Sequence, residues 1–168
     1  IRRQRQMCIR DRNNGWAYRN DNVDIQNNED PLSNGYNVGW IESDEWMQYT
    51  LKDPTSGLYN IKVRVATEDN DGSFYFKIND NQVTDLINVP NTESWTNWSF
   101  VNIDSLVVYD TDDNFVFQVK TGTFNLGFFE FERIGDINLL QTKYISSFTL
   151  SENSINIKIF NDPKIHVD

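Results

Sequence analysis

The sequence lacks paired cysteines, long apolar runs and any histidine outside its last few residues. Cys8 is the only cysteine, so neither a disulfide framework nor a cysteine-based zinc cluster can form within the chain. No apolar run approaches the roughly 18 residues of a membrane-spanning helix, and the first residues lack the apolar segment of a signal peptide. His166 is the sole histidine, which argues against Ser-His-Asp and Cys-His catalytic sites.

Positive charge is scarce over most of the chain. The formal net charge is −10, and residues 1–12 hold five arginines and one aspartate, so residues 13–168 carry a net charge of −14. An acidic surface repels phosphate backbones and anionic lipid headgroups, so neither nucleic acid nor a membrane is expected as a partner. The composition favours a neutral ligand.

The chain is expected to have three parts. Residues 1–12 have no strand or helix period and a charge opposite to everything that follows, so we interpret them as a foreign basic start, such as translated vector sequence, and exclude them from the fold. A basic arm for an acidic partner is the alternative. Residues 13–134 are predicted to form one domain, and residues 135–168 a linker with the start of a further C-terminal segment.

Helical periodicity is also missing, because no period near 3.6 residues persists for three turns. Residues 58–65 instead alternate strictly between apolar and polar, which is typical of a strand with one buried face. The DNDG sequence at residues 69–72 is predicted to be a hairpin turn. Further short strands are predicted at residues 23–26, 36–41, 46–51, 74–78, 83–89, 98–103, 115–120, 124–134, 144–150 and 155–160. The fold class is therefore all-β, and a two-sheet β-sandwich is the expected architecture.

Several segments match a known family in order and spacing: GYNVGWI followed by EWMQYTL, then SGLYNIKVRVA, VPNTESWTNW and FNLGFFEFERI. The chain resembles the carbohydrate-binding modules of family 6, noncatalytic sandwiches of the jelly-roll, galactose-binding-like type that are appended to secreted polysaccharide-degrading enzymes. The preceding YRNDNVDIQ is similar to the version found in agarases of marine Bacteroidota. The resemblance implies a secreted protein with any signal upstream, a linked catalytic domain, and a neutral polysaccharide partner such as agar or another galactan, xylan or β-glucan.

The resemblance also implies a loop site in which two aromatic rings sandwich a sugar and an amide hydrogen-bonds its hydroxyls. Carried over to this sequence, the two rings are those of Tyr36 and Trp95, and the amide is that of Asn125. The chemistry is suitable, because a pyranose presents C–H groups to an aromatic face and hydroxyls to an amide. Trp40 is assigned to a second site on the concave sheet face, as in some family members.

Both ends of the chain bear on the resemblance. The family's first strand carries a Glu-x-Glu pair that helps to hold a structural calcium ion, and here residues 1–12 stand in its place without such a pair. The tail FTLSENSINIKIFNDP is similar to the start of a C-terminal sorting domain of Bacteroidota, although Asp162 separates Asn161 from Pro163.

An enzyme is the first alternative function. Glu42 and Asp44 lie two residues apart, as Glu130 and Glu132 do, and paired carboxylates on one strand face could act as acid and base in a sandwich-fold glycoside hydrolase. The third acid that such motifs need is missing, and residues 42–45 favour a solvated turn.

A protein-adhesion sandwich is the second alternative, because it would have the same fold. Aromatic residues in a sandwich lie in the core more often than they form ligand platforms. A core position is therefore the expectation for Trp46 and Trp98.

Overall fold

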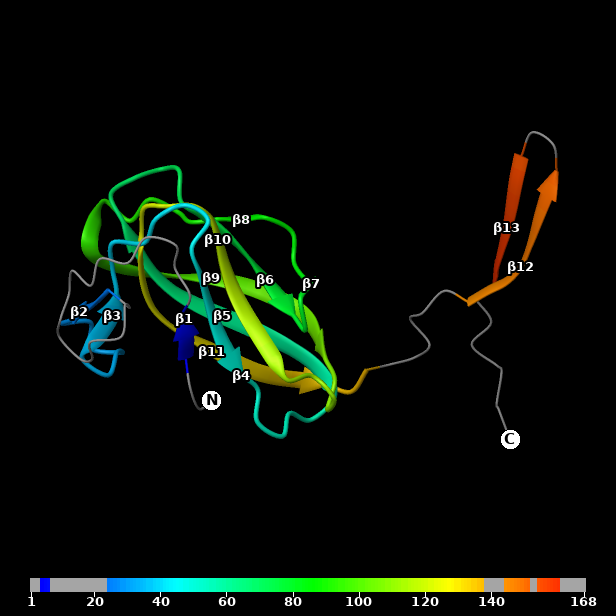
Figure 1. Cartoon of the computed structure of the whole chain (residues 1–168), viewed down its shortest axis with the longest axis horizontal. Coiled ribbons are helices and arrows are strands. Elements are labelled where there is room, and N and C mark those ends of the chain that lie inside the picture. Colours follow the sequence, from blue (N-terminus) through cyan, green and yellow to red (C-terminus); the bar gives the residue numbers. More distant parts are fainter. Residues whose placement is uncertain (1–3, 7–23, 138–143, 152–153, 161–168) are drawn as a thin grey trace. The chain divides into compact units, whose positions relative to one another are not determined.

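The computed structural model describes residues 4–6, 24–137, 144–151 and 154–160 (Figure 1), and their side chains over residues 24–137. The chain divides into two compact units, residues 1–135 and residues 136–168. No helix long and apolar enough to cross a membrane occurs among the residues that the structure describes.

The first unit is built from two antiparallel sheets, as Figure 1 shows. Sheet A has the order β1-β4-β10-β6-β7, with β8 also paired to β6. Its strands are β1 (Gln4–Gln6), β4 (Trp46–Thr50), β6 (Ser73–Ile78), β7 (Asn81–Gln82), β8 (Ile87–Asn88) and β10 (Asn114–Thr121). Sheet B has the order β2-β3-β11-β5-β9, from β2 (Ile25–Asn27), β3 (Tyr36–Val38), β5 (Gly57–Thr67), β9 (Ser94–Val108) and β11 (Asn125–Gly135). The predicted all-β sandwich is confirmed.

Large aromatic rings fill the space between the sheets. Because side chains alternate along a strand, Phe74 and Phe76 of β6 face inward with Phe115 and Phe117 of β10, and all four are fully buried. Phe117 stacks on Phe74 with ring centroids 4.7 Å apart and meets Phe129 of sheet B at 5.9 Å. The aliphatic side of the core comes mainly from the inward residues of β5, which are Ile61, Val63 and Val65.

One strand prediction and one turn prediction need correction. Residues 83–89 do not form one strand, because only Ile87–Asn88 pairs with β6. Residues 69–72 are not a hairpin turn, since β5 belongs to sheet B and β6 to sheet A, so this loop crosses from one sheet to the other. The hairpin of this region lies one strand later, where Asn79 and Asp80 both have positive φ between β6 and β7.

The N-terminal residues also depart from the expectation. The backbone of Gln4–Gln6 pairs with β4 as β1, at the edge of sheet A, although residues 1–12 were expected to lie outside the fold. Their interpretation as foreign sequence stays a prediction. Residues 7–23 lie outside the described residues, so a strand starting at residue 23 is seen only from Ile25 onward.

The second unit contains a β-hairpin. Strand β12 (Tyr144–Ser151) pairs antiparallel with β13 (Ser154–Phe160). Both strands lie where alternation in the sequence predicts them. The similarity of this tail to a sorting domain stays a prediction.

A buried ion pair fixes the loop between β2 and β3 on sheet B. Asp30 accepts two hydrogen bonds from the guanidinium of Arg64, at 2.9 Å and 3.0 Å, and its side chain is 1% exposed. The guanidinium also lies over the ring of Phe100, 4.7 Å from its centroid. The hydrogen bonds from Arg64 lower the pKa of Asp30, against the opposing effect of burial. This loop leads into β3 and from there to Trp40.

We expect Arg64→Ala to lower the free energy of unfolding by about 3 kcal/mol at neutral pH, because it leaves a buried carboxylate without its partner. Lys62→Ala is the matched control, since the exposed pair of Lys62 with Glu132, at 3.6 Å, should contribute below about 1 kcal/mol. Urea unfolding measures both. Equal losses in the two variants would contradict the account.

The same pair gives a pH dependence with a definite sign. The pKa of Asp30 is lower in the folded than in the unfolded chain, so its stabilisation is present above the unfolded pKa and is lost as the pH falls through the folded one. The stability difference between the wild type and Asp30→Asn should therefore shrink as the pH falls below about 4.

Candidate functional site

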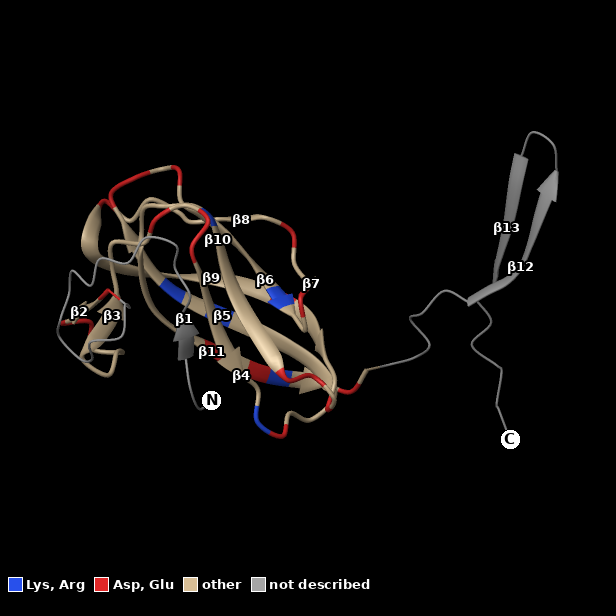
Figure 2. Ribbon diagram, in the orientation of Figure 1, with Lys and Arg blue, Asp and Glu red and all other residues tan. Residues whose placement is uncertain are grey.

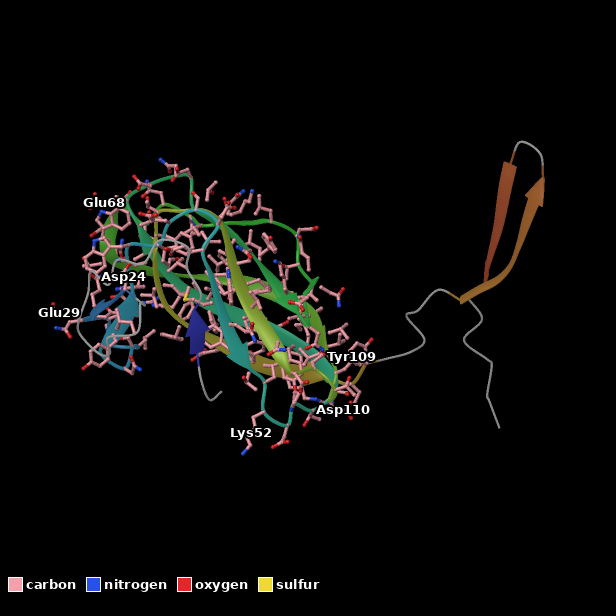
Figure 3. The ribbon with its side chains drawn as sticks, in the orientation of Figure 1. Asp24, Glu29, Lys52, Glu68, Tyr109 and Asp110 are labelled. Atoms are coloured by element: carbon pink, nitrogen blue, oxygen red, sulfur yellow. The ribbon has the colours of Figure 1, made fainter. Side chains whose placement is uncertain are left out.

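A pocket of about 430 Å³ lies at one end of the sandwich, where strand ends and loops of both sheets meet. Figure 3 labels Asp24 and Glu68 at this end and Tyr109 and Asp110 at the opposite end. The pocket is lined by Gln26, Trp40, Ile41, Asp69, Trp95, Thr123, Phe124 and Asn125. It therefore brings together three of the four residues that the sequence analysis assigned to binding.

Trp40 lies on one side of the pocket, directly after β3. Its backbone has φ of 47°, so the chain leaves the strand direction there, and its side chain is 48% exposed while the next residue, Ile41, is buried. Because Gly39 has no side chain, the backbone before Trp40 can pass close to the side-chain amides of Asn125 and Gln26. A Cβ at Gly39 would lie 3.1 Å from Asn125 Oδ1 and 3.2 Å from Gln26 Nε2.

Trp95 belongs to the start of β9, not to a free loop as predicted. Thr67 pairs with Ser94 and Val65 with Ser99, so residues 95–98 bulge out of the ladder opposite a single residue of β5. Buried Thr92 anchors the turn before the bulge, because its Oγ1 donates to the carbonyl oxygen of Thr67 at 2.9 Å. The indole of Trp95 is partly exposed toward the pocket.

Asn125 lines the pocket but is largely buried, at 5% exposure. Its Nδ2 donates a hydrogen bond of 2.8 Å to the carbonyl oxygen of Trp95. The amide therefore holds the backbone of the Trp95 bulge through one of its two N–H groups, and its Oδ1 can still accept a hydrogen bond from a ligand. This hydrogen bond to the loop backbone is the alternative role of a buried amide at position 125, beside the direct sugar contact that the resemblance implies.

Tyr36 is not among the residues that line the pocket. It lies at the first position of β3, opposite Asn27 of β2, whereas the pocket wall starts at the other end of that strand. Trp40 therefore stands where Tyr36 was expected, and the assignment of Trp40 to a separate sheet-face site does not match its place. In the sequence, the signal that Trp40 belongs to the pocket is its position between Gly39 and Ile41, at the end of the motif.

The expectation of a core position for Trp46 and Trp98 is also not met. Both side chains are only partly buried, and neither belongs to the apolar cluster between the sheets. Trp46 alternates with the buried Met47 on β4, which places it on the outer face of sheet A. Phenylalanines occupy the core positions instead.

The sequence analysis missed Gln26, Asp69 and Thr123 as pocket residues. Asp69 belongs to the loop between β5 and β6, where its backbone N–H donates to Thr67 Oγ1 at 2.9 Å. Its carboxylate accepts a hydrogen bond from the hydroxyl of Thr123. The sequence did not indicate this role, because the Asp-Gly pair in DNDG is typical of a hairpin turn.

Glu42 and Asp44, the acids of the enzyme alternative, lie on an exposed turn outside the pocket. Asp44 pairs with Lys120 at 3.5 Å, and both side chains are well exposed. Asp69 is the only carboxylate among the residues that line the pocket, whereas glycoside hydrolysis ordinarily uses two. Among the described residues, no group of three or more histidines, cysteines or acids that could hold a metal ion occurs. A structural calcium ion stays a prediction from the resemblance.

A larger hollow of about 570 Å³ lies between β9 and the segment that follows β7. Its lining combines aliphatic side chains such as Val83, Ile87 and Leu106 with polar ones that include Asp85 and Asp104, and Tyr109 is its one aromatic residue among those described. Only that one ring is available there, and it is not opposed by a second. The smaller pocket has two indoles with amide and carboxylate groups beside them, which is the better basis for a binding site.

A β-sandwich whose end pocket combines indole rings with amide groups has the features expected of a carbohydrate-binding module. The model of the family described as carbohydrate binding module (family 6) matches residues 17–133. The chain belongs to this family, which confirms the resemblance seen in the sequence. Modules of the family bind sugars without catalysis, so the expectation that this chain is not an enzyme is confirmed as well.

Solved structures of the family have the same fold. The chain is similar to the module of lichenase 5A from Cellvibrio mixtus, solved with cellotriose, at 24% identity and a TM-score of 0.59, covering 67% of this chain and 87% of that one. It is also similar to the C-terminal module of LamC, a marine laminarinase from Zobellia galactanivorans, at 30% identity and a TM-score of 0.56, covering 66% and 89%.

A curated relative comes from an animal. The chain is 27% identical over 140 residues to the clotting factor G alpha subunit of Tachypleus tridentatus, covering 82% of this chain. The chain spans only 19% of that protein's length.

Proposed function

We propose that this module binds a neutral polysaccharide by placing one sugar ring between Trp40 and Trp95. The observation that carries the proposal is that the two indoles line the same pocket and that Asp69 is the only charged side chain among the described residues that line it. Flat indoles provide apolar area for the C–H face of a pyranose, while Gln26 and Asn125 provide amide groups for its hydroxyls.

Affinity should be modest. A single pyranose between two rings forms few hydrogen bonds and buries little area, which corresponds to a dissociation constant of roughly 10 to 1,000 μM. Linkage to a catalytic domain makes such weak binding useful, because it raises the effective concentration of enzyme at the polymer surface.

We propose β-1,3-glucan as the first polymer to test, ahead of galactan and xylan. Support comes from the 30% identity to a module of LamC, because LamC is a laminarinase and laminarin is a β-1,3-glucan. The marine origin of that relative also supports the wider proposal of a secreted, enzyme-linked module from a marine bacterium, with agarases as the alternative parent.

Affinity gel electrophoresis tests the function directly. Laminarin, xylan, agarose and alginate are each embedded in a native gel, and the mobility of the chain is compared with that of bovine serum albumin. We expect laminarin to retard the chain and alginate, which is anionic, to leave it unaffected. Equal mobility in all three neutral glycans would contradict the proposal.

A further inference from the structure

Asp69 is the one charged side chain among the described residues, 24–137, that line the pocket. Two hydrogen bonds fix it, one from the hydroxyl of Thr123 to Oδ2 and one from its own backbone N–H to Thr67 Oγ1. Within the part of the chain that the structure describes, Oδ1 accepts no hydrogen bond and the carboxylate has no ion-pair partner. The pocket thus presents a fixed carboxylate oxygen beside two aromatic rings.

The loop that carries Asp69 is itself acidic. Glu68 and Asp71 are exposed on the same loop, and Figure 2 shows this loop between β5 and β6 in red. The pocket residues that the structure describes include neither lysine nor arginine. Two basic residues of adjoining strands already pair with other acids, Arg64 with Asp30 and Lys120 with Asp44.

We infer that Asp69 makes the pocket charge-selective, so that it ranks otherwise identical sugars in the order amino sugar, neutral sugar, uronic acid. An ammonium group would pair with the carboxylate and also meet the negative faces of Trp40 and Trp95. A neutral sugar can only donate a hydroxyl hydrogen to the carboxylate. The carboxylate of a uronic acid is repelled and offers no donor.

This inference rests on the proposed function, because it concerns the same pocket. Asp69 is only partly buried, so water and salt screen its charge. We therefore expect each step in the ranking to change the dissociation constant by about three- to ten-fold at low ionic strength. Added salt should compress the ranking toward equality.

The test uses the methyl β-glycosides of glucose, glucosamine and glucuronic acid. They share a ring, and each charged sugar differs from glucose at one carbon, by an amine at C2 or a carboxylate at C6. Binding is followed by chemical-shift titration at mildly acidic pH, where the amine carries its proton. Asp69→Asn keeps the acceptor for Thr123 and removes the charge, so the three dissociation constants should converge. Glu68→Gln removes a neighbouring charge outside the pocket and should preserve the ranking.

The outcomes separate the two proposals. Equal affinities in the wild type, a different order, or a ranking that survives Asp69→Asn would overturn the inference and leave the proposed function intact. The same holds if laminarin oligosaccharides bind while none of the three glycosides does. Failure of all three glycosides together with oligosaccharides of laminarin, xylan and agarose would overturn the proposed function itself.

Discussion

Replacing Trp95 by alanine should abolish retention on the polysaccharide while leaving the fold intact. The indole is the contact surface of the bulge at the start of β9 and lines the pocket, but it does not belong to the apolar core. Loss of a stacking platform costs about 2 kcal/mol or more at a binding site, which corresponds to roughly a 30-fold weaker affinity. A dissociation constant of about 100 μM would then rise to about 3 mM, which is too weak to retard the chain in the gel.

Trp40→Ala should have an effect of the same size, because Trp40 lines the same pocket and is the second ring of the proposed site. Tyr36→Ala is the matched control: this tyrosine lies on the same short segment but outside the pocket, so binding should stay within about two-fold of the wild type. Isothermal titration calorimetry with a laminarin oligosaccharide and thermal unfolding would be measured on all three variants. A large effect of Tyr36→Ala with none from Trp40→Ala would instead restore the assignment made from the sequence.

Phe117→Ala should be the most damaging substitution for stability. The ring is fully buried and contacts rings of both sheets, stacking on Phe74 at 4.7 Å and lying 5.9 Å from Phe129. Truncating such a ring leaves a cavity that neighbouring strands cannot close, at a cost of about 3–5 kcal/mol. For a module of this size the melting temperature should fall by roughly 10–20 °C.

Phe128→Ala is the control for this substitution. Phe128 neighbours Phe129 in β11 but is not part of the core cluster, and its ring contacts Phe100 at 6.0 Å. Its truncation should cost about 1 kcal/mol. Differential scanning calorimetry compares the two variants, and similar losses would show that the ring contacts of Phe117 do not dominate the core.

The sequence predicted the parts of the fold that depend on local alternation. In β5, the residues Ile61, Val63 and Val65 are buried and the polar residues between them are not, as a strand with one covered face requires. It did not predict which sheet a strand joins. The loop at residues 69–72 has the composition of a hairpin turn, and only the packing of both sheets decides that it crosses between them.

The site was predicted in part for a similar reason. Trp95 and Asn125 lie in the pocket because the motifs that contain them begin β9 and β11 at the same end of the sandwich. Tyr36 and Trp40 are both aromatic residues of one motif, and the choice between them depends on the positive φ of Trp40, which no alternation pattern encodes. Asp69 reaches the pocket only through a crossing between sheets, so its role was not visible before the fold was known.

The most direct test of the pocket as the sugar site is a titration of the tryptophan indole N–H signals with laminarihexaose by ¹H–¹⁵N NMR. The chain has five tryptophans, so each signal can be assigned by single substitution to phenylalanine. The account predicts that the signals of Trp40 and Trp95 shift together along one binding curve while those of Trp46 and Trp98 stay in place. Shifts confined to Trp46 or Trp98, with Trp40 and Trp95 unchanged, would contradict it.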